Sequence, residues 1–395
     1  MKVLYITTKP PAQASGSEIR NYHVLRSFVV NTNVTAVNVI VFDVNRTKIS
    51  YPFLNTPKVK YTNLLPKQRS IFSSTLSLLK NHVPYVDHLL NHNFDALISK
   101  QIIDADLVVF SELDGYLFAS RSLKQVPLQK KIILDCHNVD YNRIVAEMQN
   151  IKLPFKIFSN AVKNRIKKLE IEAISNVSLI FACSQSDANY FRQYISEDKI
   201  VVIPNGVDTQ IKSTKVSTKN KKVIFMGLLS YYPNIDAVRY YLDEIHPLVK
   251  LKVPAVQFEI IGRNAPSWLV KRAHADKNIK LSGYVQNVDQ HLATASVCVC
   301  PIKSGSGTRL KLLHYMASNK PIVTTTMGCE GIDVVHNKHL LIADEPSQFA
   351  SSVVKLLTDR SLAERIATSG RQLADDKYNW LNIEAEIIKA IKVLS

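Results

Sequence analysis

The chain has 395 residues, a formal net charge of +17 and five cysteines, with no Cys-x-x-Cys pair among them. This length predicts two domains rather than one core. No apolar run of about 18 residues occurs, which excludes a membrane-spanning helix, and residues 1–8 form too short a segment for a signal-peptide core. The odd number of cysteines and the absence of a disulfide-framework spacing predict reduced thiols and a cytoplasmic protein.

Apolar segments recur through the first half of the chain and predict buried parallel strands. They lie at residues 2–8, 34–42, 106–111, 131–136, 179–184 and 200–204. His137 directly follows the fourth segment, in the stretch Asp135-Cys-His-Asn138. Because α/β folds collect catalytic groups at strand ends, His137 is a candidate site residue. A hydrogen-bonded structural histidine is the alternative.

A polar, lysine-rich stretch then interrupts the pattern and is typical of a linker. Strands resume at residues 223–226, 256–261, 279–281, 297–301, 322–325 and 340–343. Helical patterns lie between many of them, as at 236–250 and 308–318. This alternation predicts an α/β fold with two doubly wound, Rossmann-like domains that face each other across a cleft.

Four segments make up the expected domain organisation. An N-terminal domain spans 1–207, a linker 208–222, a C-terminal domain 223–377, and a last helical segment 378–395.

Most of the 11 glycines lie between Gly206 and Gly331. Glycines concentrated at strand ends allow close backbone approach, most often to a ligand. Gly305 and Gly307 precede the expected helix 308–318, whose first turn carries Arg309 and Lys311. A helix N-terminus with two cations predicts an anion site, most simply for a phosphate. The alternative is a plain turn with solvated cations.

Two segments, 46–80 and 152–168, contain basic and apolar residues but no acidic ones. Such basic amphipathic segments suit an anionic membrane surface. Nucleic acid is the rival partner, but no nucleic-acid-binding motif occurs, so we expect none to bind. A solvated basic face is the remaining alternative.

Several motifs in combination resemble the glycosyltransferases of family 4, which have the GT-B fold. They are Val223–Asp236, Phe258–Arg263, Gly283-Tyr-Val285, Ser304–Ala317 and Pro321–Gly331, with Gly16-Ser-Glu18, Asp135–Asn138, Cys183–Asp187 and Ile203–Asp208 in the first half. The resemblance implies a retaining glycosyltransferase that moves a sugar from a UDP- or GDP-linked donor to an acceptor hydroxyl. It implies an acceptor-side N-terminal domain and a donor-binding C-terminal domain, with the last helix crossing back to the first.

The resemblance also implies roles for individual residues. It assigns catalytic roles to His137, Arg309 and Lys311, because a leaving diphosphate develops charge that fixed donors stabilise. It places donor-binding residues at Gly16, Ser17, Gly227, Arg263, Tyr284, Val285, Ser306, Gly307, Thr308, His314 and Glu330. It implies hexosyl transfer without a metal or cofactor. Asp104-Ala-Asp106 matches a metal-binding pattern superficially, but it precedes a buried strand and predicts a strand-entry turn.

One position departs from the family pattern. His314 stands where the family has a glutamate that grips the ribose diol, and Ser306 replaces a second glutamate. A neutral imidazole offers one acceptor and one donor. Three alternatives follow: the ribose contact is rebuilt with the help of Glu330, the donor is unusual, or the activity is weak. His314 could equally be an ordinary helix-face residue.

Two functions follow from the sequence. The first is a glycosyltransferase that builds a surface polysaccharide or glycolipid on a glycan or lipid-linked acceptor, peripheral at the inner face of the membrane. The second is a weakly active or inactive GT-B protein that binds nucleotide or glycan within an assembly.

Overall fold

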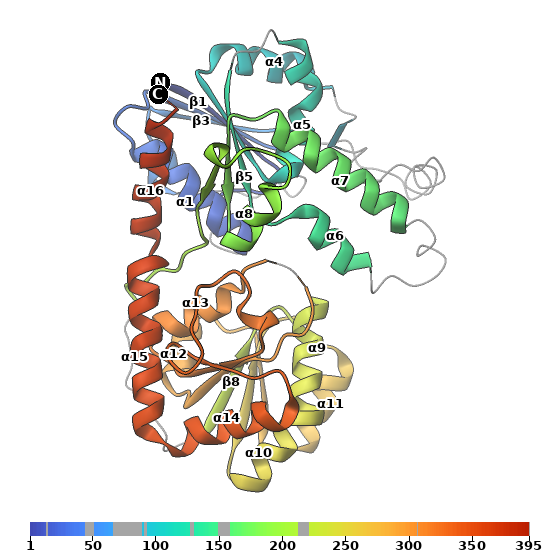
Figure 1. Cartoon of the computed structure of the whole chain (residues 1–395), viewed down its shortest axis with the longest axis vertical. Coiled ribbons are helices and arrows are strands. Elements are labelled where there is room, and N and C mark those ends of the chain that lie inside the picture. Colours follow the sequence, from blue (N-terminus) through green and yellow to red (C-terminus); the bar gives the residue numbers. More distant parts are fainter. Residues whose placement is uncertain are drawn as a thin grey trace. The chain divides into compact units, whose positions relative to one another are not determined.

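The computed structural model describes residues 1–12, 15–43, 51–65, 89–90, 93–126, 130–148, 159–211, 221–305 and 307–394. Two compact units make up the chain (Figure 1). Unit 1 contains Met1–Pro204 and Ile383–Ser395, and unit 2 contains Asn205–Asn382. Unit 1 therefore ends its first segment before the linker expected at 208–222. Residues 212–220 of that linker lie outside the described residues.

Unit 1 is built on a seven-stranded parallel sheet. Its strands are β1 (Lys2–Thr7), β2 (Ala36–Val41), β3 (Val59–Asn63), β4 (Leu107–Ser111), β5 (Lys131–Cys136), β6 (Leu179–Ala182) and β7 (Ile200–Val202). The helices are α1 (Gly16–Val30), α4 (Asp95–Asp104), α5 (Glu112–Gln125), α6 (Asp140–Met148), α7 (Ser159–Ser175) and α8 (Gln185–Phe191), with 3-10 turns η1 (Pro52–Leu54) and η3 (Glu197–Lys199). The strand order β3-β2-β1-β4-β5-β6-β7 reverses between β1 and β4. The carboxyl ends of these two strands are therefore the expected ligand position.

Unit 2 is built on a six-stranded parallel sheet. Its strands are β8 (Lys222–Met226), β9 (Gln257–Ile261), β10 (Ile279–Gly283), β11 (Val297–Cys300), β12 (Ile322–Thr324) and β13 (Leu341–Ile342). The helices are α9 (Tyr232–Tyr240), α10 (His246–Lys252), α11 (Ser267–Ala275), α12 (Val288–Ala293), α13 (Leu310–Ala317), α14 (Pro346–Thr358) and α15 (Arg360–Lys377), with the π-helical turn η4 (Tyr241–Ile245) and the 3-10 turn η5 (Met327–Cys329). The order β10-β9-β8-β11-β12-β13 reverses between β8 and β11.

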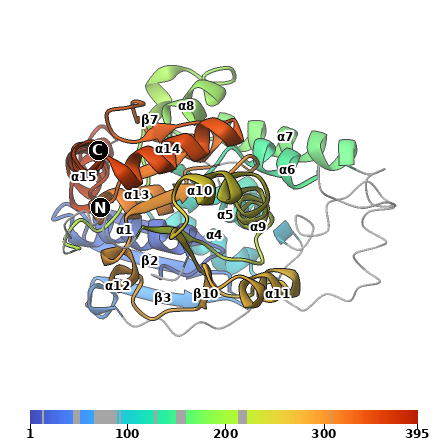
Figure 2. The same ribbon diagram turned by 90° about the horizontal axis from the view of Figure 1, so that it is seen from below.

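Each sheet lies in the core of its unit, because its central strands carry apolar residues on both faces. All five residues of β4 and all four of β11 are buried, as expected for parallel strands covered by helices. In unit 2, α10 and η4 pack against α14, whereas α13 packs against α15. Figure 2 shows α14 beside α10. The five cysteines are buried and none forms a disulfide.

The expected fold class is confirmed, since two parallel doubly wound sheets alternate with helices. Each of the expected strand segments contains a strand. The sequence analysis missed β3, which is only half-buried and alternates polar residues. This strand lies within the basic segment 46–80, which the sequence analysis predicted to contact a membrane surface. Residues 46–50 and 66–80 of that segment lie outside the described residues.

Two helix boundaries were wrong. The helix expected at 236–250 begins earlier, at Tyr232, and is interrupted by η4 before α10. The helix expected from Thr308 begins at Leu310 instead. Gly305 and Gly307 have φ of 97° and 84°, a left-handed conformation that cannot belong to a right-handed helix, so the chain enters α13 later.

The last helix, α16 (Trp380–Lys392), leads the chain from unit 2 into unit 1. Within unit 1, Glu384 of this helix lies 2.7 Å from His23 Nδ1 and also pairs with Arg26, both on α1. Glu384 is buried, and these partners compensate its charge. Within the described residues, no helix is both long and apolar enough to cross a bilayer.

Candidate functional site

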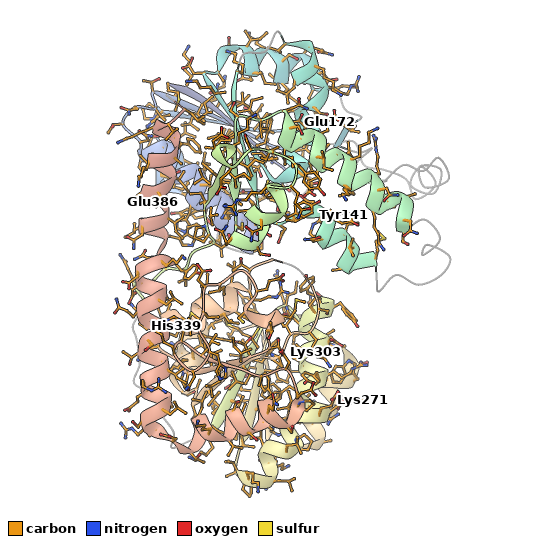
Figure 3. The ribbon with its side chains drawn as sticks, in the orientation of Figure 1. Tyr141, Glu172, Lys271, Lys303, His339 and Glu386 are labelled. Atoms are coloured by element: carbon orange, nitrogen blue, oxygen red, sulfur yellow. The ribbon has the colours of Figure 1, made fainter. Side chains whose placement is uncertain are left out.

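The loop after β11 in unit 2 forms a tight glycine turn. A Cβ on Gly305 would come within 3.1 Å of Pro233 Cγ, at the start of α9, and within 3.6 Å of Arg309 Nη2. Arg309 is only 9% exposed and donates a hydrogen bond to the Gly307 carbonyl, so its guanidinium folds back over the turn. Lys303, labelled in Figure 3, instead directs its amine to the Tyr240 ring, 3.6 Å from the centroid.

Within the described residues, two hydroxyl groups of this turn are buried without a hydrogen-bond partner. They are Ser304 Oγ and Thr308 Oγ1. Buried polar atoms in native proteins are nearly always satisfied, so an orphaned pair suggests a missing ligand. Ser306, which was expected to contact the donor, lies outside the described residues.

Lys311 is the second residue of α13 and points to the end of β8. Its Nζ is 2.6 Å from Asn234 Oδ1 and 4.1 Å from the centroid of the Phe225 ring. Burial lowers the pKa of Lys311 to about 8, and the nearby Arg309 charge adds to this effect. Within the described part of the chain no carboxylate pairs with Lys311, so its charge is available to an anion.

Gly227 and Gly262 allow the ends of β8 and β9 to meet. A Cβ on Gly262 would lie 1.9 Å from the Gly227 carbonyl oxygen, and a Cβ on Gly227 would lie 2.9 Å from Lys311 Nζ. The structure therefore brings the expected donor-binding residue Gly227 to the expected catalytic residue Lys311. Glycine is required for space at position 262, where a Cβ would meet backbone, whereas at position 227 it would meet the side chains of Asn234 and Lys311.

His314 is held by a residue that the sequence analysis did not identify. Its Nε2 lies 2.7 Å from Asp289 Oδ1, in α12. The hydrogen bond to His314 lowers the pKa of Asp289, which favours its carboxylate form. A carboxylate on α12 thus contacts His314 on α13. No motif pairs these two residues, because their contact depends on tertiary packing.

The remaining candidates of unit 2 are more exposed. Arg263 and Glu330 are exposed, and Tyr284 is 74% exposed at the end of β10, whereas Val285 is half-buried. Among the described residues, Glu330 forms no ion pair and no hydrogen bond with His314. Asp289, rather than Glu330, supplies the acidic partner.

In unit 1, His137 lies in a buried, charged network at the end of β5. Its Nδ1 is 3.0 Å from Glu112 Oε1, and its Nε2 is 3.2 Å from both Asp135 Oδ2 and Ser111 Oγ. Burial alone would lower the pKa of His137, but Glu112 and Asp135 outweigh it, so the pKa is raised. The imidazolium form is therefore favoured at this strand end.

Asp135 has a second partner that fixes the base of the site. Arg20 of α1, 1% exposed, donates from Nη2 to Asp135 Oδ1 at 2.6 Å and from Nη1 to the Ile203 carbonyl at 2.9 Å. Burial would raise the pKa of Asp135, but the Arg20 charge and His137 lower it. The pair therefore stays charged and holds the ends of β5 and β7 against α1.

Glu112 is the functional candidate that sequence reasoning missed most clearly. It is a buried non-glycine residue with φ of 61°, at the junction of β4 and α5. Its Oε1 is 2.8 Å from Lys9 Nζ, and its Oε2 is buried with no hydrogen-bond partner in the part of the chain that the structure describes. Left-handed backbone at such a residue costs energy and tends to occur at functional sites. No sequence pattern signals it.

The other two unit 1 candidates lie at the start of α1. Gly16 is its first residue and is exposed, and Ser17 Oγ lies 3.2 Å from Lys9 Nζ. Lys9 therefore links Ser17 with Glu112 and, through it, with His137. The structure brings these residues of unit 1 together, at the carboxyl ends of β1, β4 and β5.

The expected strand-entry turn at Asp104–Asp106 is confirmed. Asp104 ends α4, and Asp106 Oδ2 accepts a hydrogen bond from Lys2 N at 2.7 Å, just before β4. Among the described residues, no group of three or more histidine, cysteine or acidic side chains is arranged to hold a metal ion.

Both halves of the chain match known protein families. Residues 71–211 match the family described as Glycosyltransferase Family 4, and residues 220–359 match Glycosyl transferases group 1. A 44.6 kDa protein in the cps region of Klebsiella pneumoniae is 23% identical over 348 residues, which cover 84% of each chain.

Solved structures with the same fold cover this chain completely. Sucrose-phosphate synthase from Thermosynechococcus elongatus has a TM-score of 0.71 at 14% identity and is matched over 98% of its length. HepE from Anabaena in complex with UDP has a TM-score of 0.68 at 15% identity, over 100% of both chains. The lipopolysaccharide outer core galactosyltransferase WaaB has a TM-score of 0.65 at 15% identity, also over 100% of both. At these identities the likeness establishes the fold.

Proposed function

Because this chain belongs to the glycosyltransferases of family 4 and group 1, which have the GT-B fold, we propose that it moves a hexose from a nucleoside-diphosphate sugar to an acceptor hydroxyl with retention of anomeric configuration. The proposed donor is UDP- or GDP-linked. HepE has been solved with UDP and with UDP-glucose, which makes UDP-sugars the first donors to test.

The observation that carries the proposal is the unneutralised lysine at the glycine turn of unit 2. Lys311 has an amide rather than a carboxylate as its partner in the described part of the chain. It lies with Arg309 and two orphaned hydroxyls at the reversal of strand order between β8 and β11. A diphosphate would satisfy the hydroxyls and the cation together.

In this proposal Arg309 and Lys311 stabilise the departing nucleoside diphosphate. Breaking the bond to the sugar places negative charge on the diphosphate oxygens, and fixed cations lower the energy of that state. Gly307 and Thr308 approach the same phosphates through their backbone. Because two cations supply the charge, we expect transfer to continue in the presence of a chelator.

We assign the ribose to His314 with Asp289, and the base to the segment of Tyr284 and Val285. The Asp289 carboxylate fixes one ring nitrogen of His314, and its second oxygen can accept a ribose hydroxyl. The two side chains together then offer the acceptor that a glutamate would have provided.

We assign His137, with Gly16 and Ser17, to the sugar and phosphate groups of the donor. Among the described residues, Glu112 Oε2, next to His137, is an acceptor without a donor, and a sugar hydroxyl would supply one. Both ring nitrogens of His137 face Glu112, Asp135 and Ser111, so in this proposal the Glu112 carboxylate accepts the hydrogen bond of the sugar and His137 orients that carboxylate.

The acceptor is proposed to be a glycan or a lipid-linked glycan in surface polysaccharide synthesis. Two similar proteins support this: the one in the cps region of Klebsiella pneumoniae, and WaaB, an enzyme of the lipopolysaccharide outer core.

The test is a donor panel with matched variants. We expect hydrolysis or transfer with at least one UDP- or GDP-sugar, unchanged by a chelator, and an anomeric configuration retained in the NMR spectrum of the product. Arg309→Ala and Lys311→Ala should each lower turnover about 10²-fold, the scale of losing one transition-state charge contact. Lys303→Ala, in the same loop but directed at Tyr240, is the control. Nucleotide binding with no turnover for any donor would favour a non-catalytic GT-B protein.

A further inference from the structure

Asn234 holds the amine of Lys311 and was not among the residues that the sequence indicated. It is the third residue of α9 and is 7% exposed. Its Oδ1 lies 2.6 Å from Lys311 Nζ, and its Nδ2 donates to the Leu228 carbonyl at 3.0 Å. The reverse orientation would set the amide nitrogen against an ammonium and the amide oxygen against a carbonyl. The orientation of the amide is therefore determined by its partners.

The surroundings of Lys311 Nζ leave its position little freedom. The Phe225 ring lies beneath it, and a Cβ on Gly227 would come within 2.9 Å of it. The titratable groups that face it are Arg309, at the start of α13, and Cys300, at the end of β11. Burial raises the pKa of the Cys300 thiol, so it stays neutral. The amide of Asn234 thus holds a cation that no carboxylate of the described residues neutralises.

We propose that Asn234 is the positioning residue of the diphosphate site, whose neutral amide fixes Lys311 in place without cancelling its charge. The inference rests on the proposed function, because it takes the anion of this site to be a nucleoside diphosphate. An aspartate at position 234 could make the same hydrogen bond to Lys311, but it would form an ion pair and repel the incoming phosphates. An alanine would leave the charge and lose the fixed position.

The charge state of Lys311 provides a readout that is separate from folding. With its pKa lowered to about 8, the lysine is protonated below that pH and loses its proton as pH rises through it. A diphosphate binds the ammonium form, so the affinity of the parent protein for UDP should be full near pH 7 and fall above about pH 8. A carboxylate at position 234 would raise the pKa of the lysine and move this fall to higher pH.

The experiment is calorimetric titration of the full chain with UDP and with GDP between about pH 6.5 and pH 9.5, at constant ionic strength, since salt screens such contacts. We expect Asn234→Asp to weaken binding at pH 7 by about tenfold or more and to flatten the fall near pH 8. Asn234→Ala should weaken binding by roughly tenfold but keep that fall. The control is Asn278→Asp. Asn278 immediately precedes the amino end of β10, so this substitution adds the same charge at a position away from Lys311.

The outcomes distinguish a failure of the proposed function from a failure of the positioning role of Asn234. If the parent binds neither nucleotide, the proposed function fails. If the parent binds but Asn234→Asp has the parent's affinity and pH profile, the positioning role is wrong. If one of the two Asn234 variants folds poorly, the other still tests the positioning role. The change of nucleotide affinity with pH does not depend on how much folded protein is present.

Discussion

His314 on α13 and Asp289 on α12 form an acid–imidazole pair. Their atoms are 2.7 Å apart, and both side chains are partly exposed. This pair contributes little to stability because it is partly solvated. Its interest lies in specificity, since it places a carboxylate and an imidazole where one glutamate is expected.

Substitutions at this pair should show coupling of a definite sign. His314→Glu would set two carboxylates within hydrogen-bonding distance, which favours protonation or displacement of one of them. We therefore expect His314→Glu to lower UDP affinity about tenfold, and the double variant His314→Glu/Asp289→Asn to recover it, because an amide can donate to the new carboxylate. Calorimetry at one pH, on the parent, the two single variants and the double variant, measures the coupling between the two positions. Additive effects of the two substitutions would show that the pair does not hold the nucleotide.

Among the structural elements, strands were predicted better than helix boundaries. A buried parallel strand is a continuous apolar run, and β1, β4, β5 and β11 show it directly in the sequence. The edge strand β3 lacks such a run. The start of α13 depends on the left-handed backbone of Gly305 and Gly307, which their identity permits but does not require.

The candidate site was predictable only where one local segment carries it. Gly307, Arg309 and Lys311 fall within a few residues of one another, so their association is visible in the sequence. Asn234 and Asp289 reach the same region from α9 and α12, and only the packing of those helices shows their roles. Glu112 was missed because its distinguishing feature is a backbone angle.

The junction of β8 and β9 gives an element-scale prediction. In Gly262→Ala the added methyl would meet the Gly227 carbonyl at 1.9 Å, and backbone on both sides cannot yield easily. We expect a loss of about 3 kcal/mol in unfolding free energy, at the upper end of overpacking costs. The same shift should displace Gly227 and weaken UDP binding.

Gly283→Ala is the matched control for that substitution. Its Cβ would meet nothing within 4 Å, so only the positive φ of 65° opposes it. The expected cost is about 1 kcal/mol. Denaturant unfolding of both variants measures their unfolding free energies. Equal losses would mean that the close contact between the ends of β8 and β9 does not determine the cost of Gly262→Ala.

At the scale of the whole molecule, the basic charge is partly engaged in structure. Lys58 Nζ donates to the Val29 and Asn31 carbonyls at the end of α1. Lys167 Nζ lies 5.3 Å from the centroid of the Tyr141 ring. On α7, Arg165 and Lys168 are exposed and Lys163 is half-buried. Residues 152–158 of the second basic segment lie outside the described residues. We propose that these three basic residues contribute to contact with an anionic membrane surface.

Vesicle sedimentation tests this surface. The protein should bind anionic vesicles more than neutral ones, and salt should weaken the binding. Replacing Lys163, Arg165 and Lys168 by Gln should lower binding by up to about 1 kcal/mol per residue. The same change at the exposed Lys271, Lys277 and Lys338 of unit 2 is the control for net charge. Equal loss in both variants would make the effect one of total charge and not of α7.

Unit 1 is discontinuous in the chain, and this affects how the protein is made. Its residues 1–204 leave the ribosome before unit 2, but Glu384, which pairs with His23 and Arg26, follows unit 2. At typical rates of synthesis, the intervening unit takes roughly ten seconds or more to translate. During that interval α1 exposes the surface that α16 later covers, while unit 2, which is continuous, can complete its own core. We therefore expect the nascent N-terminal unit to depend more on chaperones than unit 2, whose chain is complete before most of α16 is made.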